Sequence, residues 1–177
     1  MKLVLLGDEH LTKISKPVAA FDANLAATIT EMFVLMERAD GIGLAAPQVG
    51  INERFFVVKI DDGIERIFIN PEIIQTSQSM CTMEEGCLSV PKFYAPVTRA
   101  EKITVQYVDQ VGKPCILEAD GLLARVIQHE NDHLNGVLFI DKLEPEQRAQ
   151  AVEAVTKKQL SFLKKLKGRK QKDANRT

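Results

Sequence analysis

The sequence contains little cysteine and no long apolar segment. Its three cysteines are an odd number, which argues against a disulfide framework and indicates free thiols in a reducing compartment. No apolar run approaches the roughly 20 residues that span a bilayer, so we expect no membrane-spanning segment. Near the N-terminus only residues 3–6 are consecutively apolar, too few for the core of a signal peptide. We therefore expect the protein to stay in the cytoplasm, where it is made.

The composition is that of an ordinary soluble domain. Of the 177 residues, 45% are hydrophobic and 27% are charged, with ten glycines and seven prolines. A chain of this length can bury roughly 70% of the surface that its unfolded form exposes, so it needs no disulfide crosslinks. No internal repeat or low-complexity linker interrupts residues 1–166. We therefore expect residues 1–166 to form a single domain.

The net charge of −1 conceals two segments of opposite sign. Residues 1–156 hold 14 Lys and Arg against 23 Asp and Glu. Residues 157–177 hold nine Lys and Arg against one acidic residue, Asp173. The body of the chain is therefore acidic and its C-terminal segment strongly basic. We expect residues 167–177 to be a disordered basic tail, although such a charge run is also typical of a solvated helix end.

Three segments show the apolar spacing of amphipathic helices. The first covers residues 23–38 and follows Asp22, a good N-cap. The second covers residues 121–135, between an Asp-Gly and an Asn-Gly pair. The third begins at about residue 145, where a proline suits the first turn. Its apolar positions are Ala149, Val152, Leu160, Leu163 and Leu166.

Four segments are rich in β-branched and aromatic residues and are separated by turn signals. They cover residues 55–60, 66–74, 103–109 and 114–119. The Gly- and Ala-rich segment 41–50 has too many small residues for either regular element, so we expect a close-packed loop there. Strands with a helix inserted late indicate an α+β fold with mainly antiparallel sheets, framed by N-terminal and C-terminal helices.

The strongest chemical signal is a His-Glu-x-x-His pattern within residues 128–136. Four residues along a helix correspond to about 400° of rotation and about 6 Å of rise, so His129 and His133 share one face. Their imidazoles can converge on one metal ion, with Glu130 beside it. A carboxylate in that place can take a proton from water that the metal has made more acidic. The pattern predicts that the central helix binds a metal.

A catalytic site usually has a third protein ligand, and no histidine follows His133. Glu144 and Glu146 follow it, but a break at a glycine and an apolar segment make them awkward ligands. The other candidate is Cys87, because a metal-bound cysteine loses its proton. A lone cysteine is more often a small buried hydrophobic residue. We interpret Cys81 and Cys115 as small hydrophobic residues of this kind.

Three motifs together resemble those of the peptide deformylase family. They are GIGLAAPQ at residues 41–48, EGCLS at residues 85–89 and QHENDH at residues 128–133. Each is ambiguous alone, but all three are complete and stand in the family order. The similarity extends over residues 1–166, and the long last helix resembles the form found in Gram-negative bacteria. It implies that residues 1–166 are a single catalytic metallohydrolase domain, with a C-terminal helix from about residue 145.

The resemblance implies a metal site and a general base. Cys87, His129 and His133 would hold one divalent metal ion, with water or hydroxide as the fourth ligand. In cells that ion is expected to be Fe2+, and Ni2+, Co2+ or Zn2+ can occupy such sites. Glu130 would act as general base on the water and then as general acid toward the leaving amine.

The resemblance also implies the reaction and the groups that stabilise its oxyanion. The side chain of Gln48 and the backbone N–H of Leu88 would donate hydrogen bonds to the oxygen of the formyl group. The reaction is hydrolysis of the N-formyl group from the formyl-methionine that starts new polypeptides, with release of formate. The substrates and partners are therefore N-formyl-methionyl nascent peptides.

The substrate pocket implied by the family is a hydrophobic slot for the methionine side chain. Ile42, Leu122 and Val126 would line it. Gly43 would let an extended peptide backbone lie against the loop, although a tight structural turn explains this glycine equally well. Glu85 would pair with Arg99 as a structural support.

Two residues depart from the common family pattern. Arg125 stands where an apolar residue is usual, and Tyr94 stands where many bacterial members have an arginine that faces the peptide. Both bear on the preference for substrate side chains beyond the first residue. Neither position belongs to the implied metal ligands or the base.

Two rival functions use the same features. A zinc endopeptidase would need a third ligand downstream and would leave the motifs at 41–48 and 85–89 unexplained. A catalytically silent homologue that docks on RNA would be favoured by a changed Glu130 or Gln48, and both are intact. The basic segment 157–177 predicts contact with the RNA of the ribosome. This prediction holds for the enzyme and for the catalytically silent homologue.

Overall fold

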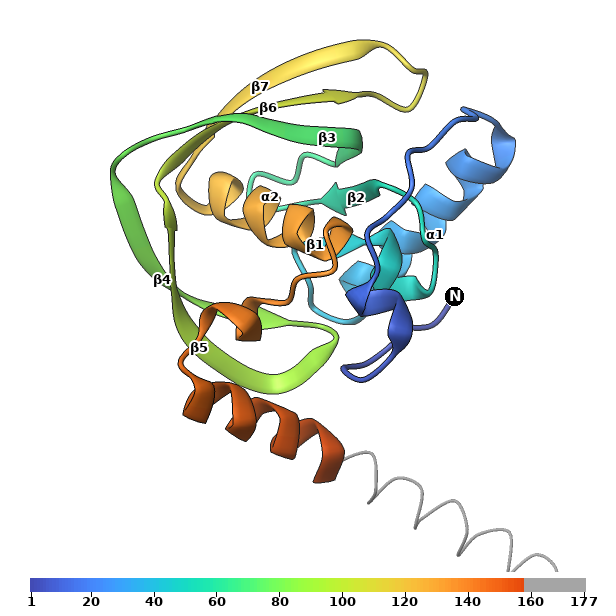
Figure 1. Ribbon diagram of the computed structural model, residues 1–177. Helices are drawn as coiled ribbons and strands as arrows, with labels where there is room; N and C mark the ends of the chain where they lie inside the picture. Colours follow the sequence, from blue (N-terminus) through green and yellow to red (C-terminus); the bar gives the residue numbers. More distant parts are fainter. Residues whose placement is uncertain (158–177) are drawn as a thin grey trace, which may run out of the picture.

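A computed structural model of the chain describes residues 1–157 and shows two antiparallel sheets around a central helix (Figure 1). The helices and short 3-10 turns are η1 (Glu9–Thr12), α1 (Ala23–Arg38), η2 (Ala46–Val49), α2 (Gly121–Leu134) and η3 (Phe139–Lys142). The strands are β1 (Gly43–Ala45), β2 (Phe55–Val58), β3 (Arg66–Thr76), β4 (Met80–Cys87), β5 (Val90–Ala100), β6 (Lys102–Val108) and β7 (Pro114–Asp120). The expected α+β class is confirmed.

Helix α1 begins and ends at the predicted residues. The carboxylate of Asp22 accepts hydrogen bonds from the backbone N–H groups of Asn24 and Leu25, both at 3.0 Å, and so satisfies two free donors of the first turn. The buried side chains recur at helical spacing on one face: Leu25, Ile29, Met32, Phe33 and Met36. This face packs on the sheet that contains β1 and β2.

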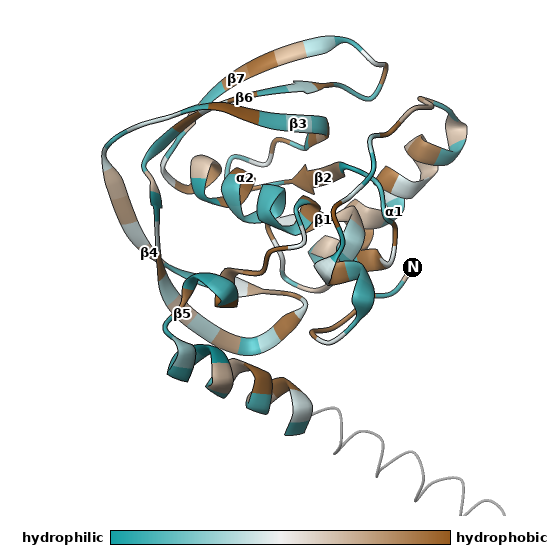
Figure 2. Cartoon of the chain, viewed as in Figure 1, coloured by the Kyte–Doolittle hydropathy of each residue, from teal (hydrophilic) through white to brown (hydrophobic). Residues whose placement is uncertain are grey.

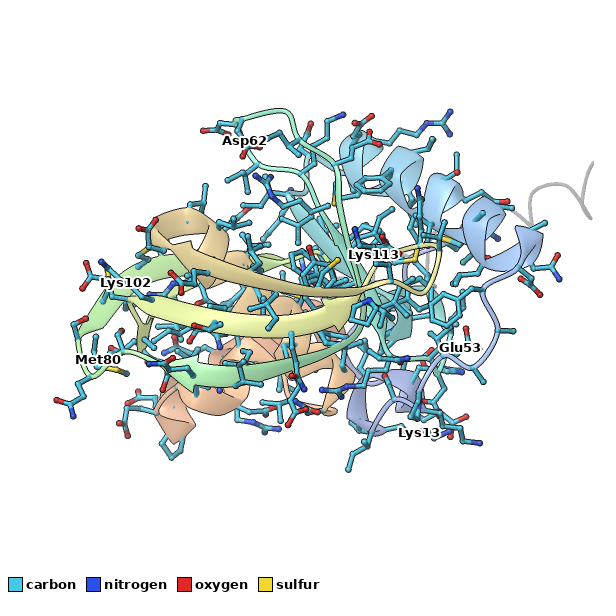
Figure 3. All side chains as sticks on the ribbon, turned by 90° about the horizontal axis from the view of Figure 1, so that it is seen from above. Lys13, Glu53, Asp62, Met80, Lys102 and Lys113 are labelled. Atoms are coloured by element: carbon cyan, nitrogen blue, oxygen red, sulfur yellow. The ribbon has the colours of Figure 1, made fainter. Side chains whose placement is uncertain are left out.

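The larger sheet has the strand order β1-β2-β3-β6-β7, with every pair antiparallel. Strand β2 is buried on both faces, because Phe55 and Val57 pack with α1 while Phe56 and Val58 pack with α2. Figure 2 shows β2 in the brown of apolar residues. Strands β6 and β7 form a long hairpin, with Lys102 at one end and Lys113 at the opposite end (Figure 3). Four of these five strands were predicted from the sequence.

The second sheet consists of β4 and β5 alone, and the sequence pattern did not predict it. Strand β5 contains two prolines, and β4 contains consecutive glutamates followed by a glycine. These residues weaken a strand prediction because proline cannot donate to a sheet and glycine usually marks a bulge. In a two-stranded sheet each strand has a free edge, where proline is tolerated. The hairpin therefore forms in spite of its composition.

The expected loop at residues 41–50 is only partly a loop. Gly43–Ala45 form β1, which pairs with β2, and Ala46–Val49 form the 3-10 helix η2. The prediction of close packing is confirmed, because Leu44, Ala45 and Ala46 are fully buried. Small side chains allow this segment to lie between α1, β2 and α2.

Helix α2 occupies the centre of the molecule, with strands of both sheets around it (Figure 1). Its buried side chains are Ala124, Arg125, Val126, Ile127, His129, Glu130, His133 and Leu134. Four of these eight carry an ionisable group, although charged side chains are almost never buried without a partner. The centre of the fold is therefore an apolar core with a polar site built into it.

The last helix begins at residue 145 as predicted, but a different face of it is buried. Ala149 and Val152 are exposed, which contradicts the predicted apolar face, while Ala151 and Val155 pack against the β4–β5 hairpin. The two small apolar residues are four positions apart and so share one face. Leu160, Leu163, Leu166 and the basic residues beyond 157 lie outside the described residues.

Within residues 1–157 no helix has both the length and the apolar character needed to cross a membrane.

Candidate metal centre

Three potential ligand atoms converge beside helix α2. One atom each from Cys87, His129 and His133 lies within 4.8 Å of the other two. The Cys87 Sγ and His133 Nε2 atoms are 3.3 Å apart, and the two imidazole rings stand nearly edge to face. The sequence predicted this grouping, and the structure brings the three residues together.

Two different elements supply these residues. His129 and His133 lie one turn apart on α2, as the i, i+4 spacing requires. Cys87 is the last residue of β4, where the register with β5 shifts between Gly86 and Cys87. Such an irregularity re-aims a side chain, and here it turns the thiol toward the helix.

The donor set fits a divalent transition metal. With metal–sulfur bonds of about 2.3 Å and metal–nitrogen bonds of about 2.0–2.1 Å, tetrahedral geometry puts sulfur and nitrogen roughly 3.5 Å apart. The separation between Cys87 Sγ and His133 Nε2 is 3.3 Å, close to that value. One thiolate and two imidazoles suit iron, nickel, cobalt or zinc better than magnesium or calcium.

Glu85 orients the first histidine. Its Oε2 atom lies 2.8 Å from His129 Nδ1, which fixes the ring and leaves Nε2 available to a metal. The guanidinium of Arg99 donates to both carboxylate oxygens, from Nε at 2.6 Å and from Nη2 at 2.9 Å. The expected pair of Glu85 and Arg99 is therefore present, and it supports a candidate ligand directly.

The electrostatics around His129 favour positive charge. Burial lowers the pKa of His129, but its hydrogen bonds with Cys87 and Glu85 outweigh burial and raise it to about 10. Burial also acts to raise the pKa of Glu85, yet Arg99 and His129 hold that pKa well below its usual range. Burial moves the pKa of His133 far below its ordinary value, so His133 is a neutral imidazole. A neutral imidazole is the form that binds metals.

Glu130 is buried beside the ligands. It is 3% exposed, and its Oε2 atom has no hydrogen-bond partner within the described part of the chain. Burial raises the pKa of Glu130 to about 7. A carboxyl group with a pKa near neutrality can both take up and release a proton. An unpaired carboxylate oxygen in such a place is poised to bind a water molecule or a substrate group.

Gly43 makes room for this carboxylate. A Cβ atom built on Gly43 would overlap Glu130 Oε1 and lie 2.8 Å from a methyl group of Val126. The glycine is therefore required by the packing of β1 against α2, in addition to any close approach of a peptide backbone. This constraint could not be read from the sequence, because residues 43 and 130 are far apart in the chain.

Gln48 reaches the ligands from the other side. Its Oε1 atom accepts from Ala45 N at 2.8 Å, which orients the amide so that Nε2 lies 3.4 Å from Cys87 Sγ and 3.3 Å from Ser89 Oγ. Gln48 is 1% exposed, so its rotamer is fixed by its surroundings. Leu88, whose backbone N–H was expected to act with Gln48, lies between Cys87 and Ser89 and lines the same cavity.

A cavity of about 590 Å³ opens beside these groups. Ile42, Gly43, Leu122 and Val126, the four residues expected to contact substrate, all line it. Cys87, His129, Glu130, Gln48 and Leu88 line it as well. An apolar wall with a few convergent polar groups is the usual form of a small-molecule or peptide site.

The two departures from the family pattern both line the cavity but differ in exposure. Tyr94 is 64% exposed, and its ring lies over Gly86 at the cavity. Arg125 is only 5% exposed and donates to Glu85 Oε1 at 2.8 Å. Tyr94 thus remains a candidate contact for substrate. The guanidinium of Arg125 is held by three acceptors of the β4–β5 hairpin.

Three residues that support the site were not identified from the sequence. Ser89 is fully buried and accepts from Gln48 Nε2, and Asp132 accepts from Arg99 Nη1 at 2.6 Å. Both lie inside the motifs at residues 85–89 and 128–133, and this position was the one feature of the sequence that could have identified them. Arg125 is the third; the sequence singled it out only as a departure from the family pattern, not as a support of the site. Glu144 and Glu146, the downstream candidates for a third ligand, are exposed and lie outside the Cys-His-His group.

Comparison with known proteins gives one family. The family model described as polypeptide deformylase matches residues 1–149. A peptide deformylase of Treponema pallidum is 49% identical over 152 residues, covering 86% of this chain and 93% of that protein. The crystal structure of a peptide deformylase from Legionella pneumophila is 45% identical, with a TM-score of 0.86, and covers 91% of this chain and 96% of that one.

A further solved structure has a bound compound. It is a peptide deformylase from Synechococcus elongatus in complex with actinonin, 46% identical with a TM-score of 0.82, and it covers 89% of this chain and 86% of that one. The family match spans most of the described chain, and the identities are well above the level at which only the fold is shared. The chain belongs to the polypeptide deformylase family.

Proposed function

We propose that the buried site formed by Cys87, His129, His133 and Glu130 is the centre at which the protein removes N-formyl groups. The protein is a metal-dependent hydrolase that releases formate from the formyl-methionine of newly made polypeptides. The observation that carries the assignment of these residues is the position of Glu130. Its unpaired carboxylate oxygen is buried beside the three ligand candidates and lines the same cavity.

Cys87, His129 and His133 hold the cation, and we propose Fe2+ as the ion used in cells. When bound, a divalent cation increases the acidity of water and polarises an amide carbonyl. Glu85 keeps His129 in the tautomer that presents Nε2, because Nδ1 carries the hydrogen that bonds to the carboxylate. The low pKa of His133 favours the neutral form that binds metals, whereas the raised pKa of His129 means that this residue must give up a proton when a cation binds.

Glu130 moves the proton. It takes a proton from the attacking water as the new bond to the formyl carbon forms, and it gives that proton to the amine nitrogen as the carbon–nitrogen bond breaks. The products are formate and a free N-terminal amine, so the atoms of one water molecule are fully accounted for. Gln48 Nε2 and the backbone N–H of Leu88 donate hydrogen bonds to the oxygen on which negative charge develops.

The cavity positions the substrate. Ile42, Leu122 and Val126 form the apolar wall that takes the methionine side chain, and the glycine at 43 keeps the backbone of β1 close to Glu130. Burial of a methionine side chain contributes roughly 1.5–3 kcal/mol to binding. The preference for an N-terminal methionine follows from the size of this wall and its low polarity.

The charge distribution of the chain bears on where the enzyme acts and what it contacts. We propose that residues 1–166 act as one catalytic domain in the cytoplasm, where formylated chains emerge from the ribosome. The acidic body and the basic segment 157–177 would orient the enzyme with that segment toward ribosomal RNA. The residues beyond 157 lie outside the described structure, so this proposal is supported by their charge alone.

Product analysis by mass spectrometry tests the reaction. The purified metal-loaded protein is incubated with a formyl-Met peptide and with its acetyl-Met counterpart of the same sequence. We expect loss of 28 Da, about the mass of one carbonyl group, from the formyl peptide only, because the slot accepts the small formyl group at the reacting centre. Cleavage at an internal peptide bond would indicate the endopeptidase. Binding without any product would indicate the silent homologue.

A further inference from the structure

We propose that Arg125 is a positioning residue of the metal centre, which ties the β4–β5 hairpin to helix α2. The inference rests on the proposed function, because it assumes that Cys87 and the two histidines share one cation. The hairpin carries Cys87, and the helix carries His129 and His133. The hairpin and the helix are separate elements, so their relative position decides whether the three ligand atoms can meet.

Arg125 makes contacts that link these elements directly. From α2, its Nη1 atom donates to Glu85 Oε1 and to the backbone oxygen of Val97, both at 2.8 Å. Its Nη2 atom donates to the backbone oxygen of Cys81 at 2.6 Å. One guanidinium thus binds a side chain and a backbone group of β4 together with a backbone group of β5. Only arginine has a planar set of donors that can bind three acceptors in this way.

The position of Arg125 on the helix relates it to a ligand. Arg125 and His129 are one turn apart, and both bind the carboxylate of Glu85, at Oε1 and Oε2 respectively. Glu85 lies two residues before Cys87 on the same strand. Glu85 therefore links the two candidate ligands, because it binds His129 and lies on the same strand as Cys87. Arg125 fixes the position of Glu85.

Arg125 is not needed merely to neutralise Glu85. Arg99 already donates two hydrogen bonds to that carboxylate and is 5% exposed. Arg99 also binds Asp132 on α2, so a second link between hairpin and helix exists. Arg125 differs from Arg99 because it also binds the backbone of both strands. Its distinct contribution is the placement of the hairpin, because Arg99 already supplies the positive charge that Glu85 needs.

Two substitutions separate placement from charge. Arg125→Lys keeps the positive charge but offers a single flexible ammonium group, which cannot bind Glu85 and both carbonyl groups at once. Arg125→Met keeps the apolar stem and removes the charge. If Arg125 acts by placement, both variants should have similar defects. If it acts by charge, the lysine should restore normal behaviour.

The readout is the metal centre itself, loaded with Co2+. We measure the rate of Co2+ transfer to a chelator and the absorption band of the cobalt–thiolate bond. We expect both variants to release Co2+ roughly 10-fold to 100-fold faster than the original protein, as is typical when a residue that orients a ligand is lost. We also expect a weaker or shifted thiolate band, a lower kcat and a KM for a formyl-Met peptide that changes little.

Arg54→Met is the matched control. Arg54 also ties α2 to the sheet, through Asn131, Asn135 and the backbone oxygen of Pro71, but among the described residues none of its hydrogen bonds goes to the β4–β5 hairpin. Its loss should lower the melting temperature and leave cobalt release and the thiolate band unchanged. This control separates a general loosening of α2 from a loss of placement at Cys87.

Three results would overturn the proposal. They are normal cobalt release and a normal thiolate band in both Arg125 variants, full restoration by lysine, and failure of both variants to fold while Arg54→Met folds. The last result would assign Arg125 to the stability of the whole fold. If the original protein binds Co2+ with a thiolate band but releases no formate, the proposed function fails and this inference does not.

Discussion

Gly43 and Glu130 touch across the interface of β1 and α2, so that a side chain at position 43 would occupy the space of the Glu130 carboxylate. The contact joins the first motif of the sequence to the third. It explains why strand β1 needs a glycine at this position even though the backbone there has ordinary strand geometry.

Replacing Gly43 with alanine should displace Glu130 and reduce turnover without removing the metal. The added Cβ meets Glu130 Oε1 and Val126, and both belong to a packed helix that cannot move away freely. A displacement of about 1 Å at a reacting group costs on the order of 100-fold in rate. Steady-state formate release and metal analysis measure the two quantities.

Gly63→Ala is the control for this substitution. Gly63 has a φ of +71° and no atom within 4 Å of an added Cβ, so alanine there adds backbone strain without steric contact. We expect lower stability, by about 1–2 kcal/mol, and unchanged activity. Normal turnover in Gly43→Ala would show that the position of Glu130 is not critical.

Replacing Glu130 with glutamine should separate binding from chemistry. The amide has the same shape but cannot accept the proton of water, so metal content should persist while turnover falls by roughly two to four orders of magnitude. Metal content is measured by elemental analysis and turnover by formate release. Near-normal activity in a metal-loaded Glu130→Gln protein would contradict the proton-transfer role.

The iron form should lose activity in air faster than the nickel form. Cys87 lines the cavity and is only partly buried, so oxygen can reach both the thiolate and a bound ferrous ion. Oxidation of either partner weakens the site. Activity is followed over time in air and under nitrogen for both forms. Equal decay of the iron and nickel forms in air would count against ligation of iron by Cys87.

Removing the charge of Glu85 should destabilise the metal-free protein strongly. Glu85 binds Arg99, Arg125 and His129 in the interior, and its side chain is 4% exposed. Glu85→Gln leaves buried guanidinium groups without their carboxylate, a change that costs about 3–5 kcal/mol. Urea denaturation measures the loss in the free energy of unfolding.

Glu37→Gln is the matched surface variant for that experiment. Glu37 pairs with Lys59 at 2.6 Å, and its side chain is 51% exposed, so its removal should cost at most about 1 kcal/mol. Similar losses in Glu85→Gln and Glu37→Gln would show that the interior network contributes no more than an exposed pair.

Deleting residues 157–177 should weaken binding to ribosomes and leave hydrolysis of a short formyl peptide nearly unchanged. The segment carries most of the positive charge of the C-terminal region, and contacts with phosphates weaken steeply as salt increases. Cosedimentation at several salt concentrations measures the binding. Association that is insensitive to salt, or full binding by the shortened protein, would contradict the proposed ribosome contact.

The sequence predicted those parts of the fold whose signals are local. Helix α1 follows from Asp22 and the spacing of its apolar residues, and strands β2, β3, β6 and β7 follow from their composition. The sequence pattern did not predict the β4–β5 hairpin, because its stability comes from packing on η3 and the last helix, which overrides the effect of its prolines. The predicted buried face of the last helix was wrong, because the helix packs on the hairpin through Ala151 and Val155.

The same distinction applies to the site. The motifs name Cys87, His129, Glu130 and His133, and the structure brings them together. The contact of Gly43 with Glu130 and the three acceptors of Arg125 arise between segments that are distant in sequence. No local pattern encodes those distances, so only the folded chain reveals them.

The most direct test of the account is an anaerobic titration of the metal-free protein with Fe2+, with formate release from a formyl-Met peptide as the readout. We expect no activity without metal, a linear rise in rate up to one equivalent of Fe2+ and no further rise beyond it, since residues 1–157 contain one group of this kind, formed by Cys87, His129 and His133. Formate release by the metal-free protein, or a rate that rises until two equivalents are bound, would contradict it.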